Sequence, residues 1–121
     1  MRTVFISGAS GNLGRAVVSR FLESGDTVFG TLLPGENLPQ ELVNERFIPI
    51  QVDLNDESAT ASEIGKIISA QGSIHVAVLT AGGFAMGGIN STSSENLLSQ
   101  FRLNVETAYH AARPIFQEMI S

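Results

Sequence analysis

A glycine-rich stretch near the start of the chain has the composition and spacing of an anion-binding turn. Ser7 to Gly14 follows the apolar run Val4–Ile6 and leads into a segment with apolar residues at helical spacing. In such a strand–turn–helix unit the first glycine permits a tight turn, the second lets backbone approach a phosphate, and the third lets helix and strand pack closely. Because the helix also directs free N–H groups and its positive dipole end at the turn, we expect Gly8, Gly11 and Gly14 to border a nucleotide phosphate.

A later segment, the glycine loop Ala81–Gly88, follows a predicted strand and falls where open α/β sheets bind ligands, beyond the carboxyl ends of strands. Asp53–Asp56 ends another predicted strand. Asp53 could simply cap the turn after its strand, and the loop could be a plain linker. Arg15 starts close enough to the glycine turn to assist a phosphate.

The elements that must position these residues alternate along the chain. Strands are predicted over residues 2–7, 26–32, 47–52 and 74–80. Helices are predicted over residues 12–24 and 39–43, from Asn55 or Asp56 to about residue 71, and from a capping box at residues 92–95 to the end. The alternation predicts right-handed crossovers and a Rossmann-type, doubly wound α/β fold: four parallel strands in the order 3-2-1-4, with helices on both faces.

Apolar residues predict the inner faces of these helices. In the first helix they are Leu13, Val17, Phe21 and Leu22, and in the third Ile64, Ile67 and Ile68. Pro114 is expected to kink the last helical region. The apolar residues that recur there at helical spacing are Leu97, Phe101, Val105, Ala108, Ala112, Ile115 and Met119.

Composition excludes several classes of protein. With 121 residues, 43% apolar and 16% charged, the chain is expected to form one packed domain. The absence of cysteine excludes disulfides and thiolate metal sites, and neither His75 nor His110 has a partner at ligand spacing, so no metal site is expected. A net charge of −5 with scattered basic residues argues against nucleic acid. Neither a membrane-spanning run nor a secretory signal is apparent, which predicts a cytoplasmic protein without membrane contact.

Four motifs occur in the order found in the short-chain dehydrogenase/reductase family. They are the glycine turn, Val52-Asp53-Leu54, Thr80-Ala81-Gly82-Gly83 and Asn104. Essentially the whole chain resembles this family. The Gly8-x-x-Gly11-x-x-Gly14 pattern resembles the family's atypical and extended members, and the Ala-Gly-Gly loop is similar to that of dihydropteridine reductase relatives.

The resemblance implies a dinucleotide cofactor, NAD or NADP, and roles for particular residues. Asp53 would bind the adenine through its carboxylate and the adjoining backbone. Asn104 corresponds to the asparagine of the catalytic tetrad, which holds the helix open around a proton-relay water; otherwise it is a polar residue on an exposed helix flank. The residues that the resemblance implies for cofactor binding are Gly8, Ser10, Gly11, Asn12, Leu13, Gly14, Asp53, Leu54, Ala81, Gly82 and Gly83.

The chain also departs from the family pattern. The catalytic serine and the Tyr-x-x-x-Lys pair of the family follow a fifth strand and have no counterpart here. Tyr109 and Arg113 imitate that spacing, but they precede the fifth strand and arginine does not shuttle a proton, so no catalytic role is expected. Residues 1–121 are therefore expected to be the cofactor-binding half of an oxidoreductase, truncated before the fifth strand and inactive alone. Leu32 and Leu33 offer neither a carboxylate nor an arginine to distinguish NAD from NADP.

Two other functions remain open at this point. One is a non-catalytic dinucleotide-binding or regulatory module, and the other is a mononucleotide or flavin binder. In either case, the open edge of the fourth strand and the apolar stripe of the last helix predict self-association, so a homo-oligomer is expected.

Overall fold

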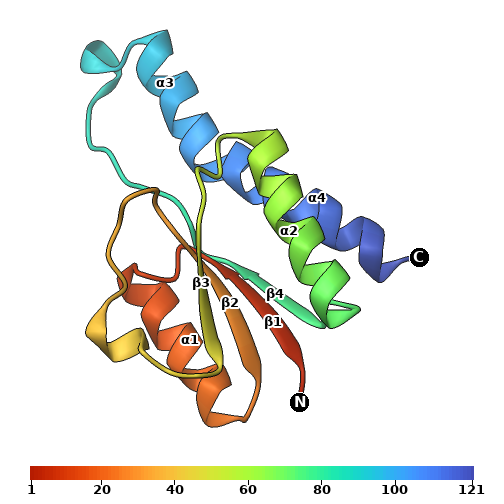
Figure 1. Ribbon diagram of the computed structural model, residues 1–121. Coiled ribbons are helices and arrows are strands. Elements are labelled where there is room, and N and C mark those ends of the chain that lie inside the picture. Colours follow the sequence, from red (N-terminus) through yellow and green to blue (C-terminus); the bar gives the residue numbers. More distant parts are fainter.

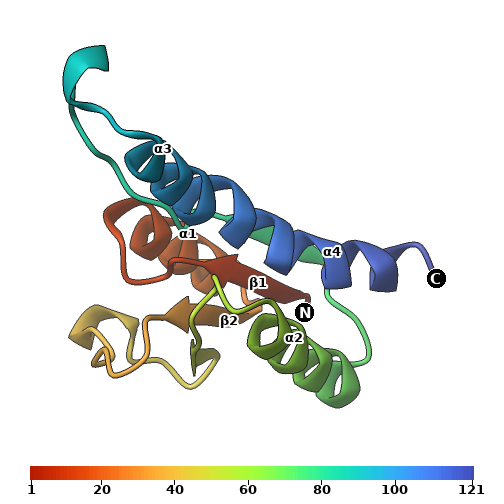
Figure 2. The same ribbon diagram turned by 90° about the horizontal axis from the view of Figure 1, so that it is seen from above.

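The computed structural model describes residues 1–121 and shows a parallel sheet between two layers of helices (Figures 1 and 2). The strands are β1 (Thr3–Ser7), β2 (Thr27–Leu32), β3 (Phe47–Gln51) and β4 (Val76–Leu79). All pair in parallel in the order β3-β2-β1-β4. The predicted fold class and strand order are therefore confirmed.

Helices on the two faces bury separate apolar clusters. Helix α1 (Asn12–Glu23) covers one face of the sheet, while α2 (Glu57–Gln71) and α4 (Thr107–Met119) lie side by side on the other (Figure 2). Side chains of β1 alternate between the clusters: Val4 and Ile6 pack with the α1 side, and Phe5 with the α2 and α4 side. Since β1 is buried on both faces, it is the rigid centre from which the glycine turn starts.

Local sequence signals set most of the helix ends. The carboxylate of Asp56 accepts the Ala59 N–H at 3.0 Å and caps α2. Gly25 and Gly72, at φ +87° and +89°, stand where α1 and α2 end. A short 3-10 helix, η1 (Gln40–Leu42), occupies the predicted helix at residues 39–43 and buries Leu42.

The C-terminal helical region differs from its prediction. It consists of α3 (Ser94–Phe101), a five-residue π-helix η3 (Arg102–Glu106) and α4, preceded by a short 3-10 helix η2 (Ile89–Ser91). The irregular turn lies at Asn104, and Pro114 lies within α4. The prediction of a capping box at residues 92–95 is wrong by one position, because Ser93 and Asn96 form it.

The predicted inner faces of the first and last helices are also partly wrong. Leu13 is 66% exposed, whereas Leu22 is buried as predicted, and α1 also buries Gly14 and Val18. Of the predicted stripe in the last region only Ile115 is buried, while the buried residues of α4 are Thr107, His110, Ala111 and Ile115. The π turn shifts the helical register, and α3 extends beyond the sheet, where nothing covers it (Figure 1). For α2, Ile64 and Ile67 are buried as predicted.

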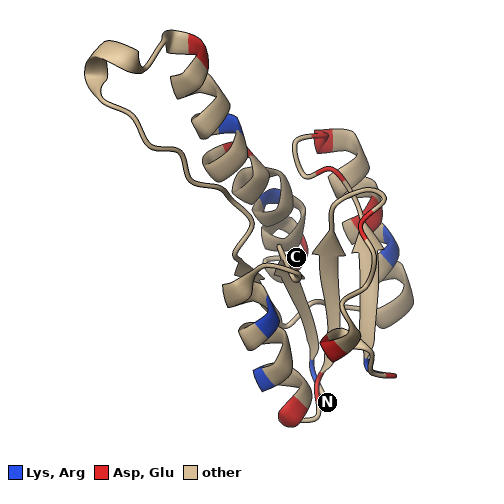
Figure 3. Cartoon of the chain, turned by 90° about the vertical axis from the view of Figure 1, so that its left-hand side faces the viewer, with Lys and Arg blue, Asp and Glu red and all other residues tan.

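Acidic and basic residues are interspersed along the elements (Figure 3). None of the helices has the length and apolar character that crossing a membrane requires.

Candidate functional site

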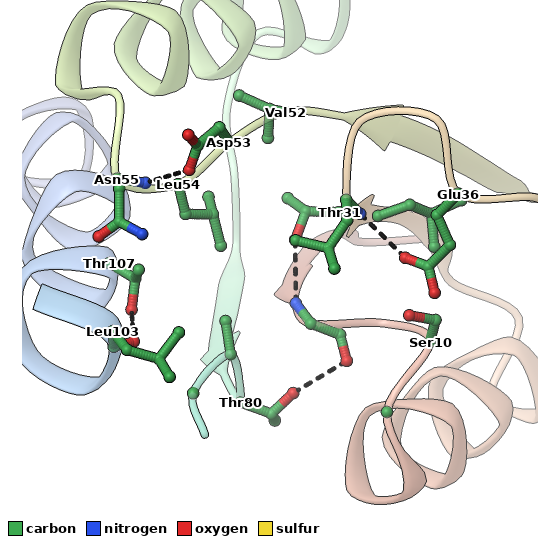
Figure 4. Close-up of a pocket in the computed structure, with 16 residues that line it drawn as sticks. Ser10, Thr31, Glu36, Val52, Asp53, Leu54, Asn55, Thr80, Leu103 and Thr107 are labelled. Atoms are coloured by element: carbon green, nitrogen blue, oxygen red, sulfur yellow. Dashed lines mark hydrogen bonds between the residues drawn. The ribbon is translucent and has the colours of Figure 1, made fainter. Parts of the chain in front are cut away.

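A cleft of ≈ 270 Å³ opens at the carboxyl ends of the strands. The β1–α1 turn and the segments that follow β2, β3 and β4 form its walls, and Leu103 and Thr107 contribute from the C-terminal helical region (Figure 4). This is the position at which open α/β sheets bind ligands, next to the central strand where the order of the strands reverses.

The glycine turn is held tightly between two neighbouring strands. Gly8 has φ +69°, and a Cβ atom on it would lie 2.8 Å from the Cα of Ala81. Its N–H donates to the buried Thr31 hydroxyl at 2.9 Å, and the Thr80 hydroxyl donates to the Ser7 carbonyl at 2.6 Å. Figure 4 shows the Thr31 bond and a second, longer bond of 3.3 Å from the Thr80 hydroxyl to the Gly8 carbonyl. Gly8 is therefore required both by its backbone conformation and by the close approach of the β4 loop.

The other two glycines of the motif have different environments. A Cβ atom on Gly14 would lie 1.9 Å from the Gly8 carbonyl oxygen, so the packing of α1 on the turn requires glycine there. Gly11 has an ordinary extended conformation, with φ −70° and ψ 167°, and a Cβ atom on it would come no nearer than 3.5 Å to the Gly8 oxygen. Neither strain nor packing requires glycine at position 11, which is the N-cap of α1 and borders the cleft.

The N-terminus of α1 is free of competing groups. No side chain caps it, and its first turn holds no acidic residue. Arg15 is turned to other partners: its guanidinium pairs with Glu41 and donates to the Asn12 Oδ1 at 3.0 Å. The helix end thus presents backbone N–H groups, and not an arginine, to the cleft.

Asp53 lines the cleft and also stabilises its own turn. One carboxylate oxygen accepts the Asn55 N–H at 2.9 Å, so the capping interpretation of Asp53 is correct as far as that oxygen is concerned. The neighbouring N–H of Leu54 donates to no acceptor in the protein. A carboxylate and an unpaired N–H side by side are the groups that could bind the amino edge of an adenine.

His110 fixes this wall of the cleft from behind. Its ring is 7% exposed, and its Nδ1 lies 2.7 Å from the Leu54 carbonyl oxygen. Since a carbonyl only accepts, Nδ1 carries the proton and donates it. Sequence reasoning did not foresee this contact, because the partners lie 56 residues apart.

Asn104 ties the glycine loop to the helix. Its Oδ1 accepts the Gly83 N–H at 3.0 Å, and its Nδ2 donates to the Gln100 carbonyl at 3.1 Å. A Cβ atom on Gly82 would lie 2.5 Å from the same Oδ1. Asn104 lies within the π-helix at residues 102–106, and its side chain links the glycine loop to this helix.

The cleft gathers most of the predicted site residues, though not all. Those that line it are Gly8, Ser10, Gly11, Asp53, Leu54, Ala81 and Gly82. Asn12, Leu13, Gly14, Gly83 and Asn104 lie outside its lining. Lining residues that sequence reasoning missed include Thr31, Glu36, Leu103 and Thr107. The available signal for Thr31 was a polar residue near the carboxyl end of a mostly apolar strand.

Comparison with known proteins agrees with this geometry. The family model for short chain dehydrogenases matches residues 2–121. The chain belongs to the short-chain dehydrogenase family. Members of this family bind NAD(P), so the glycine turn and the cleft lie where the family's cofactor site is expected.

Individual relatives within the short-chain dehydrogenases are distant. An acetoacetyl-CoA reductase of Acinetobacter sp. is 25% identical over 98% of this chain and 51% of its own length. An NADPH-dependent 3-dehydrocapnine reductase of Ornithobacterium rhinotracheale is 30% identical over 87% and 38%, respectively. A short-chain dehydrogenase from Streptomyces avermitilis superposes with a TM-score of 0.90 at 26% identity, over 98% of this chain and 45% of that one. The chain thus spans about half the length of the relatives that it matches, or less.

Proposed function

We propose that residues 1–121 form one domain, the NAD(P)-binding part of a short-chain dehydrogenase that transfers hydride between the nicotinamide and a carbonyl or alcohol. Gly11 is the observation that carries this proposal. The fold requires glycine at positions 8 and 14. At position 11, the N-cap of α1, serine or asparagine would cap the helix better, whereas glycine leaves the uncapped helix end open to a ligand.

The residues of the cleft fit such a cofactor in three parts. Ser10, Gly11 and the N–H groups of Asn12 and Leu13 would hold the pyrophosphate, with Gly8 and Gly14 shaping the turn. The Asp53 carboxylate and the Leu54 N–H would bind the adenine. Ala81, Gly82 and Gly83 would face the nicotinamide half, where the bound cofactor supplies the hydride chemistry.

Asn104 acts in this proposal as a positioning residue. Its amide oxygen accepts from the Gly83 N–H and its amide nitrogen donates to the Gln100 carbonyl, so the side chain supports the loop beside the cofactor. The relay water would then be held by the backbone of the π turn and not by the Asn104 side chain. Tyr109 is 57% exposed and does not line the cleft, and Arg113 lies near Glu57 instead. This pair would therefore not donate the proton that carbonyl reduction needs.

The relatives are about twice as long as this chain. We propose that their proton donor lies in the half that residues 1–121 do not match. Titration calorimetry of residues 1–121 with NADH and NADPH tests the first half of the proposal, and binding of at least one is expected. Oxidation of either cofactor with a panel of carbonyl compounds tests the second, and none is expected from these residues alone. If neither cofactor binds, the proposed function is wrong.

A non-catalytic dinucleotide-binding module is the second candidate, favoured by the position of Tyr109 and Arg113, which do not line the cleft. The intact mass of the natural protein, together with its reading frame, separates the two. A longer chain with a serine and Tyr-x-x-x-Lys supports the dehydrogenase, and a natural chain without them supports the module.

We further propose a cytoplasmic homo-oligomer. Its support is the exposed apolar surface of the C-terminal helices, including Leu97, Phe101 and Phe116, and the edge strand β4. Kinship with dihydropteridine reductase relatives, suggested by the Ala81-Gly82-Gly83 loop, stays a prediction.

A further inference from the structure

Glu36 enters the cleft through a turn that follows β2 directly. Its N–H donates to the Leu33 carbonyl at 3.0 Å, and Gly35 at φ +81° allows the chain to reverse there. Its Oε1 accepts the Leu33 N–H at 2.9 Å, and the side chain of Gln51 donates to its carbonyl at 2.7 Å. Both backbone and side chain of Glu36 are thus held at the wall of the cleft (Figure 4).

The charges around the cleft are of one sign. Glu36 and Asp53 are the ionisable residues of its lining, which includes no lysine, arginine or histidine. Arg15, in the first turn of α1, forms an ion pair with Glu41 and donates to the Asn12 Oδ1. A phosphate group beside Glu36 would therefore meet a carboxylate with no compensating cation.

We propose that Glu36 makes this cleft selective for NAD(H) over NADP(H), an inference that rests on the proposed function. The adenosine ribose joins the adenine to the pyrophosphate, and Glu36 borders the same cleft as Asp53 on the adenine side and Gly11 on the phosphate side. The second carboxylate oxygen of Glu36 has no partner in the protein and accepts hydrogen bonds from ribose hydroxyls. The 2′-phosphate of NADP(H) offers no such donor there and adds negative charge.

Family membership does not decide this choice, since one relative carries NADPH dependence in its name. The sequence does not predict the choice between NAD(H) and NADP(H) either, because Leu32 and Leu33 occupy the end of the strand and the Glu36 carboxylate comes three residues after Leu33. The turn from Leu33 to Glu36 brings that carboxylate back to the end of the strand.

Calorimetric titration of the 121-residue chain with NADH, NADPH, ADP and 2′,5′-ADP tests the inference without any turnover. We expect NADH to bind at least about tenfold more tightly than NADPH, and ADP to show the same preference over 2′,5′-ADP. Glu36→Gln retains an oxygen acceptor for the Leu33 N–H but loses the charge, and it should reduce both preferences to about threefold or less. Glu45→Gln makes the same change of charge on a side chain that has no hydrogen bond or ion pair and lies outside the cleft, and it should leave both preferences unchanged.

Equal binding of NADH and NADPH, or tighter binding of NADPH, overturns the selectivity and leaves the proposed function intact. Binding of neither dinucleotide overturns the proposed function and the inference together. A preference for NADH that survives Glu36→Gln, in a variant whose circular dichroism matches the parent, assigns the selectivity to another group and overturns the role of Glu36.

Discussion

Replacement of Gly11 by alanine separates the needs of a ligand from the needs of the fold. Alanine adopts φ −70° and ψ 167° without strain, and the added methyl group would stay 3.5 Å from its nearest neighbour, the Gly8 oxygen. Gly11→Ala should therefore change the free energy of unfolding by less than about 1 kcal/mol, because the unfolded chain loses freedom while the N-cap of α1 favours glycine over alanine. The same methyl group borders the cleft at the end of α1, where it should cost at least about 1.5 kcal/mol of dinucleotide binding, or about tenfold in Kd.

Two further alanine variants calibrate this result. On Gly14 the methyl group would lie 1.9 Å from the Gly8 oxygen, so the backbone must shift. The free energy of unfolding should fall by about 1–3 kcal/mol, and dinucleotide binding should weaken as well. Gly65 lies within α2 with nothing within 4 Å of an added Cβ atom. Gly65→Ala should stabilise the fold by about 0.5–1 kcal/mol and leave binding unchanged.

Urea unfolding and titration calorimetry with NADH on the same preparations measure both quantities. The reasoning predicts three distinct outcomes: binding alone lost at Gly11, both properties impaired at Gly14, and neither impaired at Gly65. Unchanged NADH affinity in Gly11→Ala would refute the placement of the phosphate at the N-terminus of α1. A stable Gly14→Ala variant would refute the close-packing argument.

Three other outcomes are expected. Asp53→Ala should weaken the binding of whole dinucleotides by about 1–2 kcal/mol and spare nicotinamide mononucleotide in calorimetry; equal losses for both ligands would assign Asp53 to the fold. Hydrogen bonds from Arg2 hold the pKa of the buried Asp26 carboxyl below its ordinary value of 3.8, so the stabilisation is present above that pH and disappears as the pH falls through the lower, folded pKa. Asp26→Asn should then lose stability at neutral pH and match the parent in strong acid, as urea unfolding from pH 2 to 7 would show; a constant difference would contradict this. Light scattering at rising concentration should detect self-association, and a monomer throughout would count against an interface on the C-terminal helices.

Local patterns in the sequence were enough to predict the order of the elements and the glycine turn between β1 and α1. Alternating strand and helix signals specify a parallel sheet because crossovers have one hand, and the requirement for Gly8 and Gly14 follows from the geometry of one strand–turn–helix unit. The resemblance to a family added Asp53 and Leu54, which the structure places on the same cleft as Ala81 and Gly82 of the glycine loop.

Tertiary structure alone decided the features that depend on distant partners. Thr31 in β2 and Thr80, directly after β4, hold the glycine turn by hydrogen bonds, and His110 reaches the Leu54 carbonyl across 56 positions. The π turn at Asn104 shifts the register of the last helix, so a periodic apolar pattern could not show which face is buried. Glu36 reaches the cleft because a turn brings it back toward the end of β2. Counting residues from the glycines cannot predict this, because the count does not show where the chain turns.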